Sequence, residues 1–168
     1  GFVESGALVL SIAAGKTIGY FEDHFCASSA VVRTMPNTPA AVGRGITALV
    51  ANSHVSSEQK AAAESLLTGV GETVWLDDEA MMDAVTAVSG GGPAYVFLLI
   101  ESMTNAGVAA GLPLDVSARL AHATVTGAGE LARQADEPPS QLRQNVTSPG
   151  GTTLEALNVL MAEDGMQD

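Results

Sequence analysis

Hydrophobic and polar positions follow two different rhythms along this chain, and the change falls near residue 78. Before that point, short apolar runs rich in β-branched residues predict strands, and stretches of helical period separate them. The expected strands cover residues 7–13, 30–35, 45–51 and 72–76, and the expected helices cover residues 17–25 and 56–68. Strands that alternate with helices are typical of an α/β sheet.

Local signals support several of these elements. Thr17 is a candidate N-cap, and Ser56 with Gln59 has the spacing of a capping box. The first strand is one continuous apolar run, which indicates burial on both faces.

After residue 78 the strand pattern disappears. Helices are expected over residues 79–88, 93–110, 115–134, 140–145 and from residue 152 onward. Pro93 suits a first turn, Asp115 is expected to cap the third of these helices, and Thr152 with Glu155 resembles a second capping box. The pattern therefore predicts an α/β domain over residues 1–78 and an all-helical domain over residues 79–168.

The helix expected over residues 93–110 is apolar nearly all round. A helix of this kind is buried on all sides, and a domain of this size offers little room for it. We therefore expect the helical half to build its core with a second copy of the chain. Small residues near the end of this helix, Gly107 among them, would allow close helix approach. The alternative is a helix buried inside one larger domain.

Composition narrows the classes of function. The 168 residues carry 7 Lys and Arg against 19 Asp and Glu, a net charge of −12, and 46% are hydrophobic. The chain is thus expected to be globular. Its acidity and scattered basic residues argue against nucleic-acid binding.

Other features fit a soluble chain in a reducing compartment. The single cysteine, Cys26, excludes an internal disulfide, fits the cytoplasm, and is expected to pack inertly rather than react. We identified no unbroken apolar run of the length that a membrane span needs. The three histidines are far apart, so no metal site is expected.

Four segments are candidates for binding. SGGGP (89–93) and SPGGTT (148–153) each precede a helix, where free N–H groups and the helix dipole favour a carboxylate or phosphate. MPNTP (35–39) and SIAAG (11–15) each follow a strand, at the sheet edge where α/β proteins bind ligands. Each segment taken alone could equally be a cap, a rigid turn or a site of close packing.

Four longer motifs occur in a characteristic order: RTMPNTPAAVGRGITAL, DAVTAVSGGGPAYVFLLIE, AGVAAGLP and QLRQNVTSPGGTTLEAL. Together they closely resemble pyrroline-5-carboxylate reductase over essentially the whole chain. The resemblance implies a Rossmann-like NAD(P)-binding domain followed by an all-helical dimerisation domain. It also implies a homodimer through the helical domain, in some members a decamer, and reduction of 1-pyrroline-5-carboxylate to L-proline with NADPH or NADH.

The resemblance also implies roles for single residues. Ile12, Ala13 and Ala14 would line the nicotinamide site, flanked by Pro36 and Asn37, and Asn145 would contact the cofactor. Glu79 would lie by the substrate. The substrate carboxylate would bind Ser148, Gly150, Gly151, Thr152 and Thr153, and we expect the Thr153 hydroxyl to donate or relay a proton to the ring nitrogen.

Three departures from the family pattern stand out. Gly91 occupies a position where the family usually has serine, so backbone groups rather than a hydroxyl are expected to matter there. Asp136 stands where some members have glutamate. The G-x-G-x-x-G loop that would bind the pyrophosphate is absent. We therefore expect an N- and C-terminally truncated chain whose activity alone is an open question.

Two alternatives to a reductase stay open. The chain could be a non-catalytic dimerisation fragment of such an enzyme. It could also be a related two-domain dehydrogenase, but those typically carry a catalytic lysine on a helix, and the two lysines here, Lys16 and Lys60, both precede the helical half.

Overall fold

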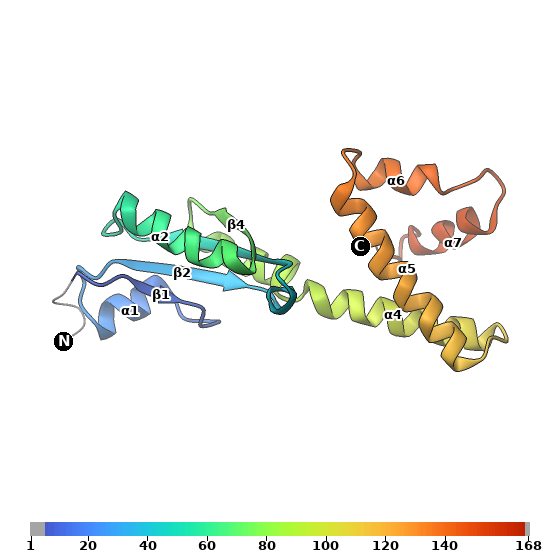
Figure 1. Ribbon diagram of the computed structural model, residues 1–168, viewed down its shortest axis with the longest axis horizontal. Helices are drawn as coiled ribbons and strands as arrows, with labels where there is room; N and C mark the ends of the chain where they lie inside the picture. Colours follow the sequence, from blue (N-terminus) through green and yellow to red (C-terminus); the bar gives the residue numbers. More distant parts are fainter. Residues whose placement is uncertain (1–5, 167–168) are drawn as a thin grey trace. The chain divides into compact units, whose positions relative to one another are not determined.

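The computed structural model describes residues 6–166, and the chain divides into two compact units that meet between Leu98 and Leu99. The first unit contains a four-stranded sheet with helices on both faces (Figure 1). Its elements are β1 (Val9–Ser11), α1 (Ile18–His24), β2 (Val31–Pro36), η2 (Thr38–Val42), β3 (Gly45–Ala51), α2 (Ser57–Leu67), η3 (Thr68–Val70), β4 (Gly71–Trp75), η4 (Glu79–Met81), α3 (Met82–Val85) and η5 (Thr86–Gly90).

The sheet is mixed, with the strands in the order β1-β2-β3-β4. β1 pairs with β2 in parallel, β2 with β3 antiparallel, and β3 with β4 in parallel. The antiparallel pair arises because only the short η2 connection joins β2 to β3, whereas parallel strands need a longer crossover. This mixed sheet, followed by helices, confirms the expected fold class.

Two apolar clusters hold the first unit together, one on each face of the sheet. Val31 points to the face covered by α1 and by Met82, and Val32 points to the face covered by α2. Both side chains are fully buried. The alternation follows from the two-residue period of a strand, and it makes this unit a three-layer α/β/α arrangement (Figure 1).

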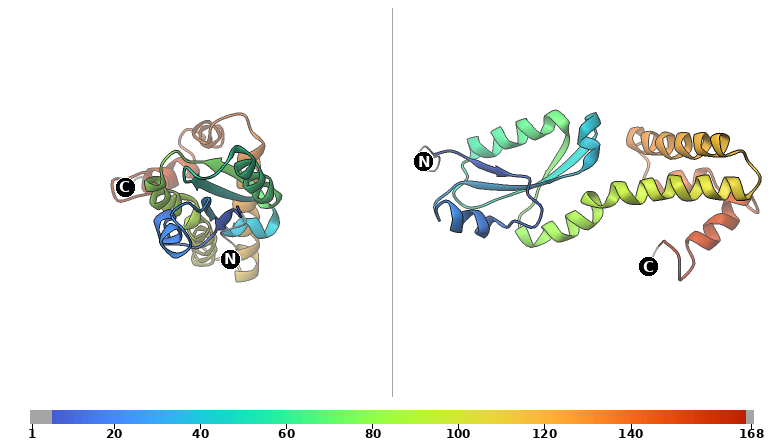
Figure 2. Two further views of the ribbon diagram at one scale, coloured as in Figure 1. Left: turned by 90° about the vertical axis from the view of Figure 1, so that its left-hand side faces the viewer. Right: turned by 90° about the horizontal axis from the view of Figure 1, so that it is seen from below.

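The second unit is entirely helical in the residues that the structure describes. The helix α4 (Gly92–Ala109) begins in the first unit and continues into the second, and Figure 2 shows it as one continuous rod. The others are α5 (Leu114–Gln134), α6 (Pro139–Asn145) and α7 (Thr152–Leu160). The predicted domain boundary at residue 78 stays a prediction.

Close packing of α4 against α5 depends on a glycine and a serine. A Cβ on Gly107 would overlap the Oγ of Ser117, and this buried hydroxyl donates to the carbonyl oxygen of Thr104 at 2.7 Å. The hydrogen bond joins the two helices where their backbones approach. The small residue expected to allow close helix approach therefore does so here within one chain.

Some local predictions were right and others were wrong. Thr17 caps α1, and Ser56 with Gln59 forms the capping box of α2. Asp115, however, is inside the first turn of α5, whose N-cap is Pro113. Rigid proline geometry can start a helix without a side-chain cap.

The first strand is shorter than predicted. It covers Val9–Ser11 rather than residues 7–13, and its apolar residues Val9 and Leu10 are only half-buried. Among the described residues, β1 is the outermost strand and pairs with β2 alone. The expected burial on both faces was wrong, since Val9 and Leu10 are covered less completely than Val31 and Val32 of β2.

The apolar helix α4 is exposed rather than buried. None of its residues is buried, and Phe97 and Leu98 are 58% and 60% exposed. Among the described residues, the helical run Glu79–Ala109 is long and apolar enough to cross a membrane by length and composition alone. A few polar residues interrupt this run, so it contains no unbroken apolar stretch of membrane-spanning length.

Candidate active site

One edge of the sheet gathers two of the predicted binding segments. Because β1 and β2 are parallel with Ser11 opposite Arg33, the segments that follow the two strands leave from the same edge. The Thr34 hydroxyl donates to the carbonyl oxygen of Ser11 at 2.9 Å and ties these strand ends together. Residues 12–17 are exposed, and residues 36 and 37 are half-exposed. The edge can therefore receive a ligand.

The loop after β2 is rigid. The Asn37 Oδ1 accepts a hydrogen bond from the Ile46 amide at 2.9 Å, and η2 ends at Gly43 in a left-handed conformation, with φ of 69°. The Asn37 side chain thus fastens the loop to the start of β3. Its amide nitrogen remains available to donate to a ligand.

A cavity of about 410 Å³ brings the MPNTP loop together with the SGGGP segment. Residues from both segments line it, together with apolar residues of α4. The lining residues are Asn37, Pro39, Val88, Ser89, Gly92, Pro93, Val96 and Phe97. The structure therefore joins two segments that are about fifty positions apart in the sequence.

The SGGGP segment does not present a free helix N-terminus, so that expectation was wrong. A π-helix over Thr86–Gly90 runs directly into α4, and the Gly91 amide donates to the Thr86 carbonyl oxygen at 2.8 Å. The preceding turn already uses this donor. π-Helical turns occur frequently at functional sites, and here the turn sets the wall of the cavity.

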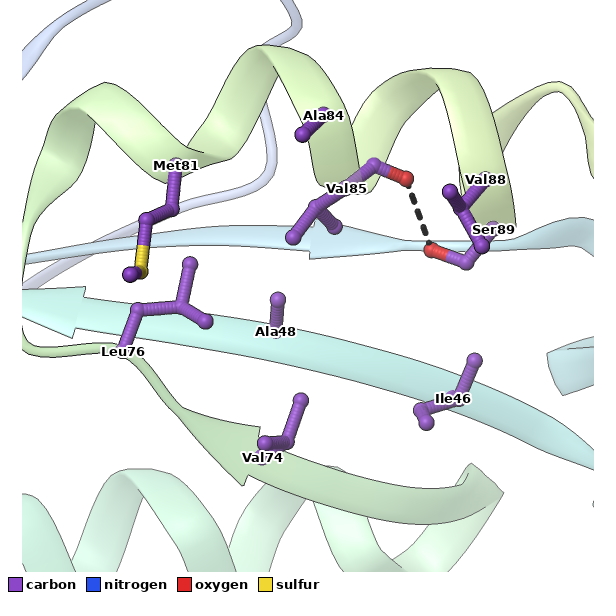
Figure 3. A pocket seen from close by; sticks show the side chains of 9 residues that line it. All are labelled: Ile46, Ala48, Val74, Leu76, Met81, Ala84, Val85, Val88 and Ser89. Carbon is purple, nitrogen blue, oxygen red and sulfur yellow. Dashed lines mark hydrogen bonds between the residues drawn. The ribbon is translucent and has the colours of Figure 1, made fainter.

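A second cavity, of about 460 Å³, shares Val88 and Ser89 with the first but differs from it in chemistry. Figure 3 shows the side chains that line it. Its walls are almost wholly apolar. The lining residues are Ile46, Ala48, Val74, Leu76, Met81, Ala84, Val85, Val88 and Ser89. The one hydroxyl, on Ser89, donates to the Val85 carbonyl oxygen at 3.1 Å. This cavity offers no charged group to an anionic ligand.

The N-terminus of α7 is free, as the sequence predicted for an anion site. Ser148 to Gly151 form a tight turn in which the Gly151 amide donates to the Ser148 carbonyl oxygen at 3.1 Å. Gly150, with φ of 69°, supplies the left-handed residue of this turn. Thr152 and Thr153 begin the helix and are exposed. Their amides lie in the first turn, where no intrahelical carbonyl can reach them.

The second capping box was a wrong prediction. The N-cap of α7 is Gly151, not Thr152, and no side chain caps the helix. The helix begins at Thr152, one residue earlier than a Thr152 cap would require, because the turn ends at Gly151. The hydroxyls of Thr152 and Thr153 are consequently not used to cap their own helix.

Asn145 is held by its own segment. Its Oδ1 accepts from the Gln141 side chain at 2.8 Å, and its Nδ2 donates to Glu137 at 3.3 Å. All three side chains are exposed. The cofactor role expected for Asn145 stays a prediction.

Glu79 is in the first unit, and its carboxylate already accepts two hydrogen bonds from other residues. Its Oε1 accepts from the Arg33 guanidinium at 2.8 Å and from the Ile18 amide at 2.9 Å. The expected contact with the substrate stays a prediction. Sequence reasoning missed Arg33 as Glu79's partner, although one signal was present: a charged residue in the middle of an apolar strand needs a counter-charge.

Cys26 lies in the connection between α1 and β2 and is exposed rather than packed as expected. Its expected inertness stays a prediction. The Ser28 hydroxyl lies 3.1 Å from its Sγ. Hydrogen bonds from the Ser28 side chain and backbone lower the pKa of the Cys26 thiol.

Comparison with known proteins identifies the family. The family model for the dimerisation domain of pyrroline-5-carboxylate reductase matches residues 79–168. This chain belongs to the pyrroline-5-carboxylate reductase family. It is 47% identical over 153 residues to the pyrroline-5-carboxylate reductase of Synechocystis sp. and 47% identical over 155 residues to that of Pseudomonas aeruginosa. These alignments cover 91% and 92% of this chain but 57% of each relative.

Solved structures agree with this assignment. A pyrroline-5-carboxylate reductase from Coxiella burnetii matches with a TM-score of 0.89 and 42% identity, covering 95% of this chain and 59% of that one. The Plasmodium falciparum enzyme, described with NADP bound, matches with a TM-score of 0.84 and 38% identity, covering 95% and 64%. The chain spans little more than half the length of the curated relatives it matches.

Proposed function

We propose that this chain forms the later part of the nucleotide-binding domain and the dimerisation domain of a pyrroline-5-carboxylate reductase. The whole enzyme reduces the C=N bond of 1-pyrroline-5-carboxylate to give L-proline. The observation that carries this proposal is the free N-terminus of α7. A tight turn precedes this helix, and two exposed threonines begin it. A helix N-terminus of this kind suits the substrate carboxylate.

The sheet edge of the first unit fits the nicotinamide ring. Ile12, Ala13 and Ala14 are exposed in the loop that follows β1, and two of the three have methyl side chains, so a flat ring can approach the backbone. Pro36 and Asn37 flank this loop from the neighbouring strand. When bound, NADPH or NADH supplies the hydride. The P. falciparum relative, described with NADP bound, supports this class of cofactor.

The α7 segment supplies the groups that handle the substrate. The substrate carboxylate is held by the backbone amides of Thr152 and Thr153. Ser148, Gly150 and Gly151 in the preceding turn complete this carboxylate site. A protonated imine is already electrophilic at carbon, so the site needs no strong general acid. The Thr153 hydroxyl holds or relays the proton at the ring nitrogen. Asn145 completes the set proposed for the cofactor.

A second copy of the chain is the proposed partner of the helical half. The exposed apolar face of α4 is too extensive to stay in water, and the matching family model is a dimerisation domain. Burial of this face between two copies gives a homodimer, from which a higher oligomer can be built. The proposal includes no nucleic-acid or membrane partner, and it places the protein in the cytoplasm.

Replacing Leu98 with glutamate is expected to weaken this dimer. Leu98 is 60% exposed in the single chain, and a buried charge without a partner is costly. We expect the dimer dissociation constant to rise by about 30-fold or more, measured by sedimentation equilibrium. The control is Leu66→Glu on α2, where the leucine is 67% exposed and the oligomer should not change. Equal behaviour of the two variants would contradict the α4 interface.

Activity can be tested with the chain extended at its N-terminus by the first strands and glycine-rich loop of the Synechocystis relative. Oxidation of NADPH is followed at saturating 1-pyrroline-5-carboxylate, and proline is identified as the product. Turnover by the extended protein supports the proposal. A folded dimer that binds NADPH but forms no proline would instead indicate a non-catalytic dimerisation module or a different imine substrate.

A further inference from the structure

An ion pair between buried Arg33 and half-buried Glu79 joins three segments of the first unit. Arg33 is 5% exposed, and among the described residues it is the only buried one with a charged side chain. Its guanidinium contacts the Glu79 carboxylate at 2.8 Å, while its Nε has no hydrogen-bond partner. A guanidinium this deeply buried is tolerated only with an anion beside it. Glu79 supplies that anion from 46 positions away in the sequence.

The same carboxylate oxygen also accepts the backbone amide of Ile18, the first residue of α1, at 2.9 Å. Thr17 caps the third amide of this helix, at Tyr20. Glu79 therefore satisfies an N-terminal amide that the local cap does not reach, and its negative charge faces the positive end of the α1 dipole.

All three joined segments lead into the candidate cofactor site. Ile18 follows the exposed loop of residues 12–17, and Arg33 lies on β2, three residues before Pro36. Glu79 begins the helical segment that leads to Ser89 and Gly92 in the wall of the cavity. One oxygen atom of Glu79 thus joins the start of α1 and the middle of β2 to the start of η4.

The other end of the 12–17 loop is fixed as well. The Ser11 carbonyl oxygen accepts from Thr34 at 2.9 Å, and the Ser11 Oγ accepts from the Ala13 amide at 3.2 Å. The loop is therefore clamped at Ser11 by β2 and at Ile18 by Glu79, while the residues between are exposed. Loss of the Glu79 clamp would free one end only.

We propose that Glu79, paired with Arg33, is a positioning residue that holds the 12–17 loop in the conformation that binds the nicotinamide. This inference rests on the proposed function for the identity of the ligand. It assigns Glu79 an effect on cofactor binding through the loop, which differs from direct contact with the substrate. The two roles predict opposite kinetic results.

The test is Glu79→Gln, with Glu64→Gln as the matched control. Glu64 is also half-buried and accepts a hydrogen bond, from Thr73 at 3.3 Å, but it lies on α2 at the other face of the sheet. Amide hydrogen exchange of residues 12–18 is measured on both variants. We expect exchange there to be about tenfold faster in Glu79→Gln and unchanged in Glu64→Gln.

Kinetics of the extended enzyme described above give the second readout. We expect Glu79→Gln to raise the Kd for NADPH, measured by fluorescence, by about fivefold or more, with KM for 1-pyrroline-5-carboxylate changed less than about twofold. A rise in the substrate KM alone would overturn the proposal in favour of direct contact. Unchanged loop exchange in a folded variant would also overturn it.

A further variant keeps the proposal testable if Glu79→Gln does not fold. Glu79→Asp keeps the charge that buried Arg33 needs but shortens the side chain, so that it cannot reach both Arg33 and Ile18. Faster exchange at residues 12–18 is expected here too, and native exchange would overturn the proposal. Exchange and NADPH binding need no turnover. If the enzyme binds NADPH but does not reduce the imine, the proposed function is contradicted, while the proposal for Glu79 can still be tested.

Discussion

Gly71→Ala is expected to lower the free energy of unfolding by about 4 kcal/mol, the sum of backbone strain and a steric overlap. Gly71 has φ of 151° and ψ of −154°, a region that essentially only glycine adopts. A Cβ at this position would overlap the carbonyl oxygen of Gly45, its partner in the parallel β3–β4 register. Because both obstacles are backbone, no side-chain movement relieves them. Urea unfolding followed by Trp75 fluorescence measures the change.

The control for this substitution is Gly69→Ala, two residues earlier in η3. A Cβ there meets no atom within 4 Å, so we expect a change within about 0.5 kcal/mol. Equal stability of the two variants would show that the β3–β4 contact yields more readily than the structure indicates. A loss confined to Gly71→Ala supports close backbone approach as the reason for glycine at position 71.

Replacing Thr152 and Thr153 together with alanine is expected to lower kcat/KM for 1-pyrroline-5-carboxylate by about 100-fold. The two hydroxyls are exposed at the N-terminus of α7 and do not cap their own helix. Each is proposed to make a hydrogen bond to a charged or reacting group of the substrate, and such bonds contribute about 1.5–3 kcal/mol. The backbone amides remain in the double variant, so residual binding is expected.

The single variants separate the two hydroxyls. Thr153→Ala should lower kcat if this hydroxyl relays the proton, whereas Thr153→Ser should restore most of the rate. Thr124→Ala, which removes an exposed hydroxyl from α5, serves as the control and should leave both constants unchanged. An unaltered kcat/KM in the Thr152 and Thr153 double variant would remove the α7 segment from the proposed site.

Elements with strong local signals were predictable residue by residue. β3 was expected over residues 45–51 and covers Gly45–Ala51, and α2 was expected over residues 56–68 and covers Ser57–Leu67 with its capping box. In both cases the deciding interactions, an apolar pattern and a reciprocal cap, lie within a few residues of one another. Such interactions can be detected in the sequence because the chain itself brings the partners together.

Errors arose where distant residues decide the local structure. The SGGGP segment has the composition of a loop before a helix, yet it continues a π-helix into α4, and this π-helix contacts β2. Glycine composition alone does not separate these outcomes. The Arg33–Glu79 pair was missed for a similar reason, since its members are 46 positions apart and meet only through the sheet.

The order of strands and helices, the family, and the candidate binding segments near strand ends and at the start of α7 could all be predicted from the amino-acid sequence alone. Three features depend on the folded structure: which of these segments share a cavity, which helix N-terminus stays free, and the burial of the Arg33 charge. Periodicity and caps act over a few residues and leave a local trace. Burial and ion pairing depend on contacts between distant segments, so they are settled only when the sheet assembles.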